Sequence, residues 1–338
     1  MILILTNNDE NTTDEVIDWL HYYKSPFIRI NGGDVQNLKS IRINDGANQT
    51  KFTVDGEEVC SDNISSYWYR RGEMNIGYEK SVVKPLNEIN LSKLDKSSHL
   101  SGTGFQGYFT GEQSDIESFI SLQFIDKKTN SIGNFYNNYT IKIQNLTIAS
   151  TCGLNVPDTL VTPYRDDVLK FYNEHNQVIV KAIKNGVGID IDNRKYLGMT
   201  TLFKKDDIDN LPHHFFPMLF QECLTKRYEL RIFYLRGEFY ASAIFSQNDQ
   251  QTKVDFRNYN YNKPNRTPPF RLPTDLKEKL YSFMDKVNMD SGSIDMIVTD
   301  INKYVFLEVN PIGQFAQVSK PCNYYLERLV AKSLINIE

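Results

Sequence analysis

The chain lacks the features that mark membrane proteins and dedicated nucleic-acid binders. No apolar run in its 338 residues approaches the ~20 residues that a membrane-spanning helix needs. Its 38 basic and 42 acidic side chains give a formal net charge of −4, without the basic excess that is typical of a nucleic-acid binder. We therefore expect neither a membrane nor a nucleic acid as a partner.

Cysteine is also scarce. The four cysteines are far apart and form no CxxC motif, which argues against a disulfide framework or a zinc site and indicates a reducing compartment. Residues 1–6 have no basic leader, and their run of aliphatic side chains is too short for the core of a signal peptide. We expect a cytoplasmic protein whose first residues form a buried strand.

The composition, with 40% hydrophobic and 24% charged residues, is typical of a soluble globular protein, and the length suggests about two domains. Short apolar strands at residues 2–6, 27–30 and 67–69 alternate with polar or helical stretches, which include a helix at 14–23. This β-α-β order predicts a small α/β domain with a mainly parallel sheet.

The pattern changes after about residue 130. Helical spacing is present at residues 142–152 and 275–288, and most of the remaining strands cluster in the last third of the chain, where antiparallel pairing is expected. No internal repeat or low-complexity linker interrupts the chain. The predicted fold class is α+β.

Two acidic residues and an asparagine form the strongest functional cluster. Asp295 lies in one apolar strand, and Glu308 and Asn310 lie in the next, so antiparallel pairing would bring Asp295 near Glu308. Side chains alternate along a strand, which puts Glu308 and Asn310 on one face. These are hard oxygen ligands of the kind that Mg²⁺ takes together with substrate phosphates. The alternative is an exposed strand with acidic residues by chance, but a charge among apolar neighbours needs a partner.

Lys181 is the second signal. It interrupts the apolar strand at residues 178–183, although a lysine is almost never buried without a partner. An anion such as a nucleotide phosphate would supply that partner. The alternative is a lysine whose stem lies along the sheet while its ammonium group reaches water.

The other candidates are weaker. The apolar strand at residues 219–224 ends in a polar turn whose backbone groups could bind an adenine edge, and Glu229 and Arg231 alternate along the next strand. Arg257 is ambiguous by itself, and the loop around Gly186 and Gly188 is too short for a known phosphate-binding motif. No histidine lies near a serine or cysteine that could be a nucleophile, so a catalytic triad finds no support.

The order of these motifs resembles the ATP-grasp superfamily over about residues 130–338. Within it, the chain is most similar to the graspetide macrocyclases, the microviridin-type peptide ligases, and above all to their grasp-with-spasm branch. The stretches that carry this resemblance are residues 66–72, 153–162, 216–222 and 304–314.

The resemblance implies an ATP-grasp fold with an N-terminal α/β pre-ATP-grasp domain. The boundaries expected from it are an N-terminal domain at residues 1–125, a central subdomain with the leader-binding segment at 126–225, and a C-terminal subdomain at 226–338. Two departures from the family pattern are present: Asn145 stands where the family has Gln, and the glycine loop is poorer than in ligases for small substrates.

The resemblance also implies ATP and Mg²⁺ as cofactors and assigns roles residue by residue. The residues expected at the magnesium ions are Asp295, Glu308 and Asn310. Those expected at ATP are Lys142, Lys181, Glu222, Cys223, Leu224, Glu229, Arg231 and Arg257, with Cys223 and Leu224 acting through their backbone and the two arginines serving also in catalysis.

Such enzymes use ATP to convert a carboxylate, which is a poor acyl donor, into an acyl phosphate that a hydroxyl or amine attacks. The family applies this to Asp or Glu side chains of a ribosomally made precursor peptide, and its grasp-with-spasm branch favours esters with Thr or Ser over amides with Lys. The implied partners are the precursor, leader plus core, and a second copy in a homodimer. Asp206 and Asp207 are expected to contact the leader. The alternatives are an ATP-grasp ligase that adds amino acids to small substrates or protein tails, and a non-catalytic ATP-binding module.

Overall fold

The computed structural model describes residues 1–72, 74–77, 102–127, 130–135, 141–184, 188–191, 194–197, 200–249, 251–252 and 260–336. The chain forms two compact units. Unit 1 combines Met1–Phe135 with Leu326–Glu338, and unit 2 is Tyr136–Tyr325. The three-part division expected from the sequence stays a prediction.

Unit 1 contains a parallel three-stranded sheet and a four-stranded sheet, together with three α-helices among its described residues. Its elements are β1 (Ile2–Thr6), α1 (Asn11–Tyr22), β2 (Phe27–Asn31), β3 (Gln36–Asn44), β4 (Ala47–Val54), β5 (Glu57–Cys60), the 3₁₀ turn η1 (Ser61–Asn63), β6 (Ser66–Tyr69), β7 (Ile76–Gly77), α3 (Gly102–Lys127) and α9 (Leu326–Ile335).

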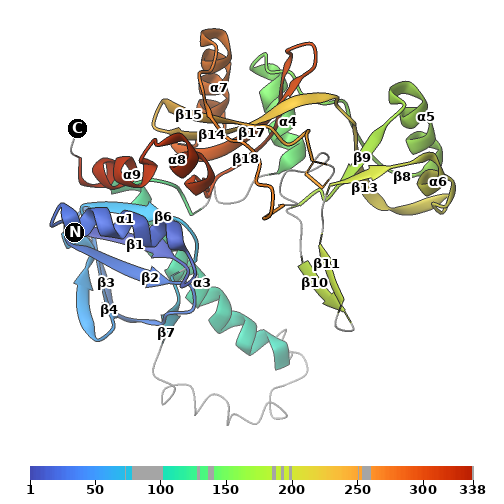
Figure 1. Cartoon of the computed structure of the whole chain (residues 1–338). Coiled ribbons are helices and arrows are strands. Elements are labelled where there is room, and N and C mark those ends of the chain that lie inside the picture. The colour runs from blue at the N-terminus through green and yellow to red at the C-terminus, as the bar shows by residue number, and fades with distance from the viewer. Residues whose placement is uncertain are drawn as a thin grey trace. The chain divides into compact units, whose positions relative to one another are not determined.

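The parallel sheet has the strand order β2-β1-β6, which confirms the predicted β-α-β start of the chain. All five residues of β1 are buried, as expected for a parallel strand that is covered on both faces. Leu3 and Leu5 join a core cluster with Phe52 of β4 and Phe124 of α3. The helix α1 lies along the sheet (Figure 1), and its Val16 is fully buried.

The last helix of the chain packs in unit 1 beside the first. Figure 1 shows α9, in red, next to α1, in blue. Arg328 of α9 donates from Nε to the Tyr23 hydroxyl at 2.9 Å, and its guanidinium carbon lies 5.3 Å from the centre of the Trp19 ring. Burial of Leu326 and Val330 completes this contact surface.

Unit 2 contains two antiparallel sheets that matter for the site. Its elements are α4 (Lys142–Thr151), β8 (Thr159–Tyr164), α5 (Arg165–His175), β9 (Val178–Lys181), β10 (Gly188–Ile191), β11 (Arg194–Leu197), β12 (Thr201–Phe203), α6 (Lys205–Asp209), β13 (His214–Glu222), β14 (Lys226–Leu235), β15 (Glu238–Ile244), β16 (Pro269–Phe270), α7 (Thr274–Lys286), β17 (Ser291–Thr299), β18 (Tyr304–Asn310) and α8 (Ala316–Cys322).

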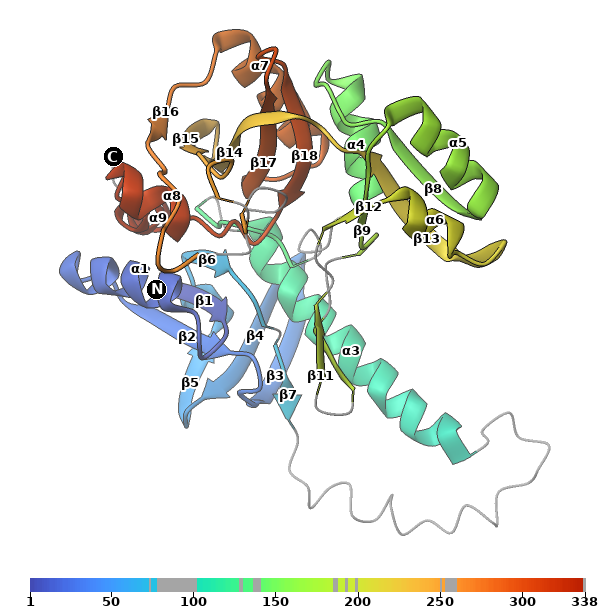
Figure 2. The ribbon, with the colours of Figure 1, turned by 45° about the vertical axis from the view of Figure 1, so that its right-hand side comes forward.

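The larger sheet has the order β16-β15-β14-β17-β18. Helices α4 and α7 cover one face of it (Figure 2), and α7 contributes Leu276, Leu280 and Phe283 at the spacing of one helix face. Since these side chains pack against Ile232 and Phe306 in one cluster, the opposite face of the sheet carries Arg231 and also the buried Phe233, which packs on Phe315.

The smaller sheet has the order β12-β9-β13-β8. Helices α5 and α6 lie beside it (Figure 2) and cover one face through Val168, Phe171 and Ile208, which pack against Phe220. Its strands and those of the larger sheet are antiparallel, in agreement with the predicted α+β class. Among the described residues, no helix is both long and apolar enough to cross a membrane.

Candidate active site

Three charged residues lie in one row across the larger sheet. Arg231 of β14 is paired in register with Asp295 of β17, and Asp295 is paired in turn with Glu308 of β18. Arg231 Nη1 donates to both carboxylate oxygens of Asp295, at 2.7 and 2.6 Å. The predicted proximity of Asp295 and Glu308 is therefore present, and an arginine adjoins them.

A β-bulge turns Glu308 toward the polar face. The register of β18 shifts next to Asp295: Asp295 pairs with Glu308, whereas Met296 pairs with Phe306, so Leu307 is an extra residue. Phe306 and Val309 both belong to the hydrophobic core, although strict alternation would place them on opposite faces. A bulge of this kind lets Glu308 and Asn310 share the face opposite the core while Phe306 stays buried.

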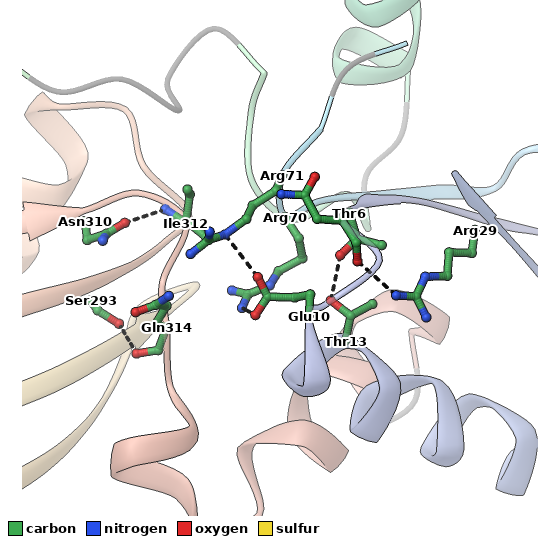
Figure 3. Close-up of polar contacts among 11 residues, drawn as sticks. Thr6, Glu10, Thr13, Arg29, Arg70, Arg71, Ser293, Asn310, Ile312 and Gln314 are labelled. Carbon is green, nitrogen blue, oxygen red and sulfur yellow. Dashed lines mark hydrogen bonds and ion pairs between the residues drawn. The ribbon is translucent and has the colours of Figure 1, made fainter. Parts of the chain in front are cut away.

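Asn310 ends β18 beside Ser293 of β17. Its Oδ1 accepts a hydrogen bond of 3.1 Å from the backbone N–H of Ile312, and Ser293 Oγ donates to the carbonyl oxygen of Gln314 at 2.8 Å (Figure 3). These bonds hold the turn after β18 and fix the orientation of the Asn310 carboxamide.

Lys142, the first residue of α4, faces the same row. Its Nζ lies 3.3 Å from Glu308 Oε2 and 3.5 Å from the carbonyl oxygen of Ala182, just beyond β9. The lysine therefore links the acidic row on the larger sheet with the end of the strand that carries Lys181.

A cavity of about 430 Å³ lies between the two sheets of unit 2. It brings together four of the residues predicted at ATP, namely Lys181, Glu222, Cys223 and Leu224. The other lining residues are Pro157, Gln177, Ile179, Leu202, Gln221, Thr225, Lys226, Gln247, Ile297 and Leu307.

The segment Glu222–Leu224, which we call the hinge, is held by backbone bonds. Glu222 exchanges two hydrogen bonds with Asp158: its N–H donates to the Asp158 carbonyl oxygen at 3.1 Å, and its Oε1 accepts from the Asp158 N–H at 2.9 Å. The Cys223 N–H donates to the carbonyl oxygen of Gln177 at 3.0 Å. Since that N–H is already used, the carbonyl is the backbone group that Cys223 can offer to a ligand.

The ammonium groups of Lys181 and Lys226, which line the cavity, affect the ionisation of Cys223. Burial raises the pKa of the Cys223 thiol, and the charges of Lys226 and Lys181 oppose that rise. Lys226 also forms an ion pair with Glu229, whose other carboxylate oxygen accepts a hydrogen bond from the Ser246 hydroxyl. Lys226 was not among the residues predicted from the sequence, where its position outside the apolar strands carried no signal.

Some predicted residues lie elsewhere. Arg257, Gly186 and the segment around Arg257 fall outside the described residues. Asp206 and Asp207 lie on the short helix α6. The Asp207 carboxylate accepts the Lys204 backbone N–H at 2.8 Å and so caps its own helix. Asp206 is exposed, and its carboxylate has no hydrogen bond or ion pair within the part of the chain that the structure describes.

The oxygen ligands of Asp295, Glu308 and Asn310 are of the kind that a magnesium ion prefers. Mg²⁺ is usually held by one or two carboxylates together with substrate phosphates and water, and Asp295, Glu308 and Asn310 supply two carboxylates and a carboxamide. Within the described ranges no three His, Cys, Asp or Glu side chains are grouped so that they could hold a metal ion, so the Asn310 carboxamide and substrate phosphates would complete the ligand set.

Comparison with known proteins agrees with this architecture. No protein-family model matches the sequence, and no curated protein matches it. Among solved structures, a RiPP-associated ATP-grasp ligase from Chryseobacterium gregarium, in complex with ADP and a leader and core peptide, is 26% identical, with a TM-score of 0.76 over 99% of this chain and 96% of that one. The chain has the fold of the RiPP-associated ATP-grasp ligases.

Two further structures share this fold. The macrocyclase MdnC from Microcystis aeruginosa MRC, bound with the precursor peptide MdnA, is 23% identical, with a TM-score of 0.75 and coverage of 99% of both chains. The ATP-grasp ligase PsnB, complexed with a minimal precursor variant, Mg and ADP, is 15% identical, with a TM-score of 0.67 over 99% of this chain and 97% of that one. The ATP-grasp fold and the graspetide resemblance predicted from the sequence are confirmed.

Proposed function

We propose that the protein is an ATP- and Mg²⁺-dependent peptide macrocyclase. It activates Asp or Glu side chains of a ribosomally made precursor as acyl phosphates and joins them to Thr or Ser hydroxyls as ω-esters, with release of ADP and phosphate. The observation that carries this proposal is the row Arg231–Asp295–Glu308 beside a cavity that contains Lys181 and the hinge. The similar structures bound to leader, core or precursor peptides support a peptide substrate.

The residues divide the chemistry among them. Asp295, Glu308 and Asn310 would hold Mg²⁺, which neutralises the phosphates of ATP when it is bound. Lys142 and Lys181 place positive charge at the two edges of the site, where negative charge grows on the transferring phosphoryl group. Arg231 keeps the Asp295 carboxylate oriented through its double hydrogen bond. Arg257 is proposed to act as a second phosphate-side arginine.

Recognition of the leader is proposed at α6. The first turn of the helix contains two consecutive acidic residues after Lys205, and Asp206 is the one whose carboxylate is not engaged in a described contact. A basic segment of a leader helix could pair with it. A homodimer and a cytoplasmic location are part of this proposal.

Mass spectrometry tests the function directly. A short Thr-, Glu- and Asp-rich peptide encoded beside this protein would be the natural substrate. Incubated with the enzyme, ATP and Mg²⁺, it should lose the mass of one water for each ring that closes. Mild alkali should restore the mass if the bond is an ester, whereas an amide would resist it.

Two other outcomes would replace the proposal. A mass gain that corresponds to added free glutamate would indicate an ATP-grasp ligase of the amino-acid-adding kind. Nucleotide binding without any product, with every offered peptide, would indicate a non-catalytic module.

A further inference from the structure

The carboxyl ends of β1 and β6 in unit 1 carry a charged cluster that the proposed chemistry does not use. β1 lies in the middle of the parallel sheet, with β2 on one side and β6 on the other. In open α/β sheets, ligands bind outside the carboxyl ends of the strands at the point where the strand order reverses. Glu10 follows β1 at this point, and Arg70 and Arg71 follow β6.

Glu10 lies between the two arginines. Its Oε1 is 3.2 Å from Arg70 Nη2, and its Oε2 is 3.0 Å from Arg71 Nε (Figure 3). The Arg70 side chain is 2% exposed and that of Glu10 is 11% exposed, whereas that of Arg71 is 34% exposed. Arg71 is therefore the member of the cluster that a ligand can reach.

Among the described residues, the cluster has one positive charge in excess. Burial lowers the pKa of Arg70 to about 10, against the opposing effect of Glu10, so Arg70 stays protonated at neutral pH. The neighbouring Arg29 does not add to this excess, because its Nη1 pairs with Asp14 at 2.5 Å. Two cations thus share one carboxylate in a mostly buried place, where an unbalanced charge favours binding of an anion.

Arg71 presents one edge of its guanidinium group. Its Nε forms an ion pair with Glu10 but no hydrogen bond, and its two terminal nitrogens have no hydrogen bond or ion pair within the described residues. That edge is a planar pair of donors, which matches the two oxygens of a carboxylate.

The backbone around Arg71 is held close to β1. The Arg71 N–H donates to the carbonyl oxygen of Leu5 at 3.1 Å, and the N–H of Gly32 donates to that of Thr6 at 2.7 Å. Gly72 follows with a φ of +79°, and a Cβ there would lie 2.6 Å from the Thr6 carbonyl oxygen. This packing fixes the position from which the Arg71 side chain extends.

We propose that unit 1 carries a carboxylate-binding site in which Arg71 binds an Asp or Glu side chain of the substrate peptide, while Glu10 and Arg70 position it. The identity of the ligand as part of a peptide rests on the proposed function. One excess charge and one planar donor edge suit a carboxylate better than a phosphate dianion, which would need more positive charge.

Two amino-acid derivatives with uncharged, blocked backbone ends test the contact between Arg71 and a side-chain carboxylate. Nα-acetylglutamate α-amide carries one side-chain carboxylate, and Nα-acetylglutamine α-amide is its uncharged match. Binding is measured by saturation-transfer NMR with saturating ADP and Mg²⁺ present, so that the site in unit 2 is filled. The glutamate probe should bind about tenfold more tightly than the glutamine probe.

Variants then assign the contact. Arg71→Gln should reduce affinity for the glutamate probe about tenfold, Arg71→Lys should retain part of it, and Arg42→Gln, on the exposed part of β3, should leave it unchanged. Thermal unfolding of each variant checks that the fold is intact. Equal binding of both probes, no effect of Arg71→Gln, or stronger competition by inorganic phosphate than by the glutamate probe would overturn the proposal. None of these readouts needs ring formation, so this site and the macrocyclase function can fail separately.

Discussion

Arg231 and Asp295 face each other on adjacent antiparallel strands, and one guanidinium nitrogen of Arg231 contacts both carboxylate oxygens of Asp295. The Arg231 side chain is buried, and such a charge needs its partner. A carboxylate oxygen has more than one lone pair, so Asp295 can hold this arginine and still face a cation. The pair therefore orients a candidate metal ligand without consuming it.

We predict that Glu308→Gln lowers the rate of ring formation by at least about 100-fold, because one charged ligand for Mg²⁺ is lost. Most of the affinity for ADP should remain, since Lys181 and the hinge are unchanged. Quenched-flow mass spectrometry gives the rate and calorimetry gives the affinity. Glu238→Gln, at the exposed start of β15, is the matched control and should behave as the wild type. Near wild-type ring formation at saturating Mg²⁺ would remove Glu308 from the metal site.

Reversal of one charge on α6 tests leader recognition. Asp206→Lys should weaken binding of the precursor about tenfold, because the exposed carboxylate is replaced by a repelling ammonium group. ADP affinity should not change. Asp207 is the poorer choice, since its carboxylate caps the helix. Asp166→Lys, at the exposed start of α5, makes the same charge change on a neighbouring helix. If both variants bind the precursor like the wild type, the leader binds elsewhere.

Cys223 reports on nucleotide binding without any substrate. ADP with Mg²⁺ should slow its alkylation by iodoacetamide several-fold, while Cys152, which does not line the cavity, should react at an unchanged rate. Burial raises the pKa of Cys223, so less thiolate is present at neutral pH and the reaction rate should rise with pH beyond the range of an ordinary thiol. Peptide mass mapping follows both cysteines in one sample. Alkylation of Cys223 at the same rate with and without ADP would contradict the placement of the hinge.

Substitutions at Gly46 and Gly72 distinguish the cost of a strained backbone from the cost of steric overlap. Gly72 and Gly46 have φ values of +79° and +77°, but a Cβ at Gly72 would lie 2.6 Å from the Thr6 carbonyl oxygen, whereas none of the described atoms is within 4 Å at Gly46. Gly46→Ala should lower the free energy of unfolding by about 1 kcal/mol through the left-handed conformation alone. Gly72→Ala should lower it by roughly 1–3 kcal/mol more, because the strand ends must move apart. Urea unfolding measures both, and equal losses would show that β1 and the loop at Gly72 are not tightly packed.

Local signals predicted much of the fold. The continuous apolar run at residues 2–6 forms the buried strand β1 as expected, and β4 is joined to β5 at Asp55-Gly56, a pair that is typical of hairpin turns. The same kind of pair, Asp45-Gly46, joins β3 to β4. The long helix α3 has only a weak signal in the sequence, because the glycines of its first half weaken any helical pattern.

The candidate site was predictable where residues lie on neighbouring strands and not where partners come from distant segments. Asp295 and Glu308 are joined by a short connection, so their proximity follows from a simple hairpin. The contact of Lys142 with Glu308 joins α4 to β18. No local sequence pattern predicts a contact between residues so far apart in the chain. The cluster of Glu10 with Arg70 and Arg71 likewise depends on the parallel pairing of β1 with β6.

The extra residue at Leu307 also affects how this chain can be compared with others. β18 changes its phase there by one position, so a relative without the bulge aligns with this strand correctly only if a single-residue gap is opened at Leu307. Deletion of Leu307 would restore strict alternation, with Phe306 and Val309 still in the core and Glu308 and Asn310 still on the opposite face. Loss of this one residue is therefore compatible with the site, whereas an ungapped alignment would pair the metal-facing residues of one chain with core residues of the other.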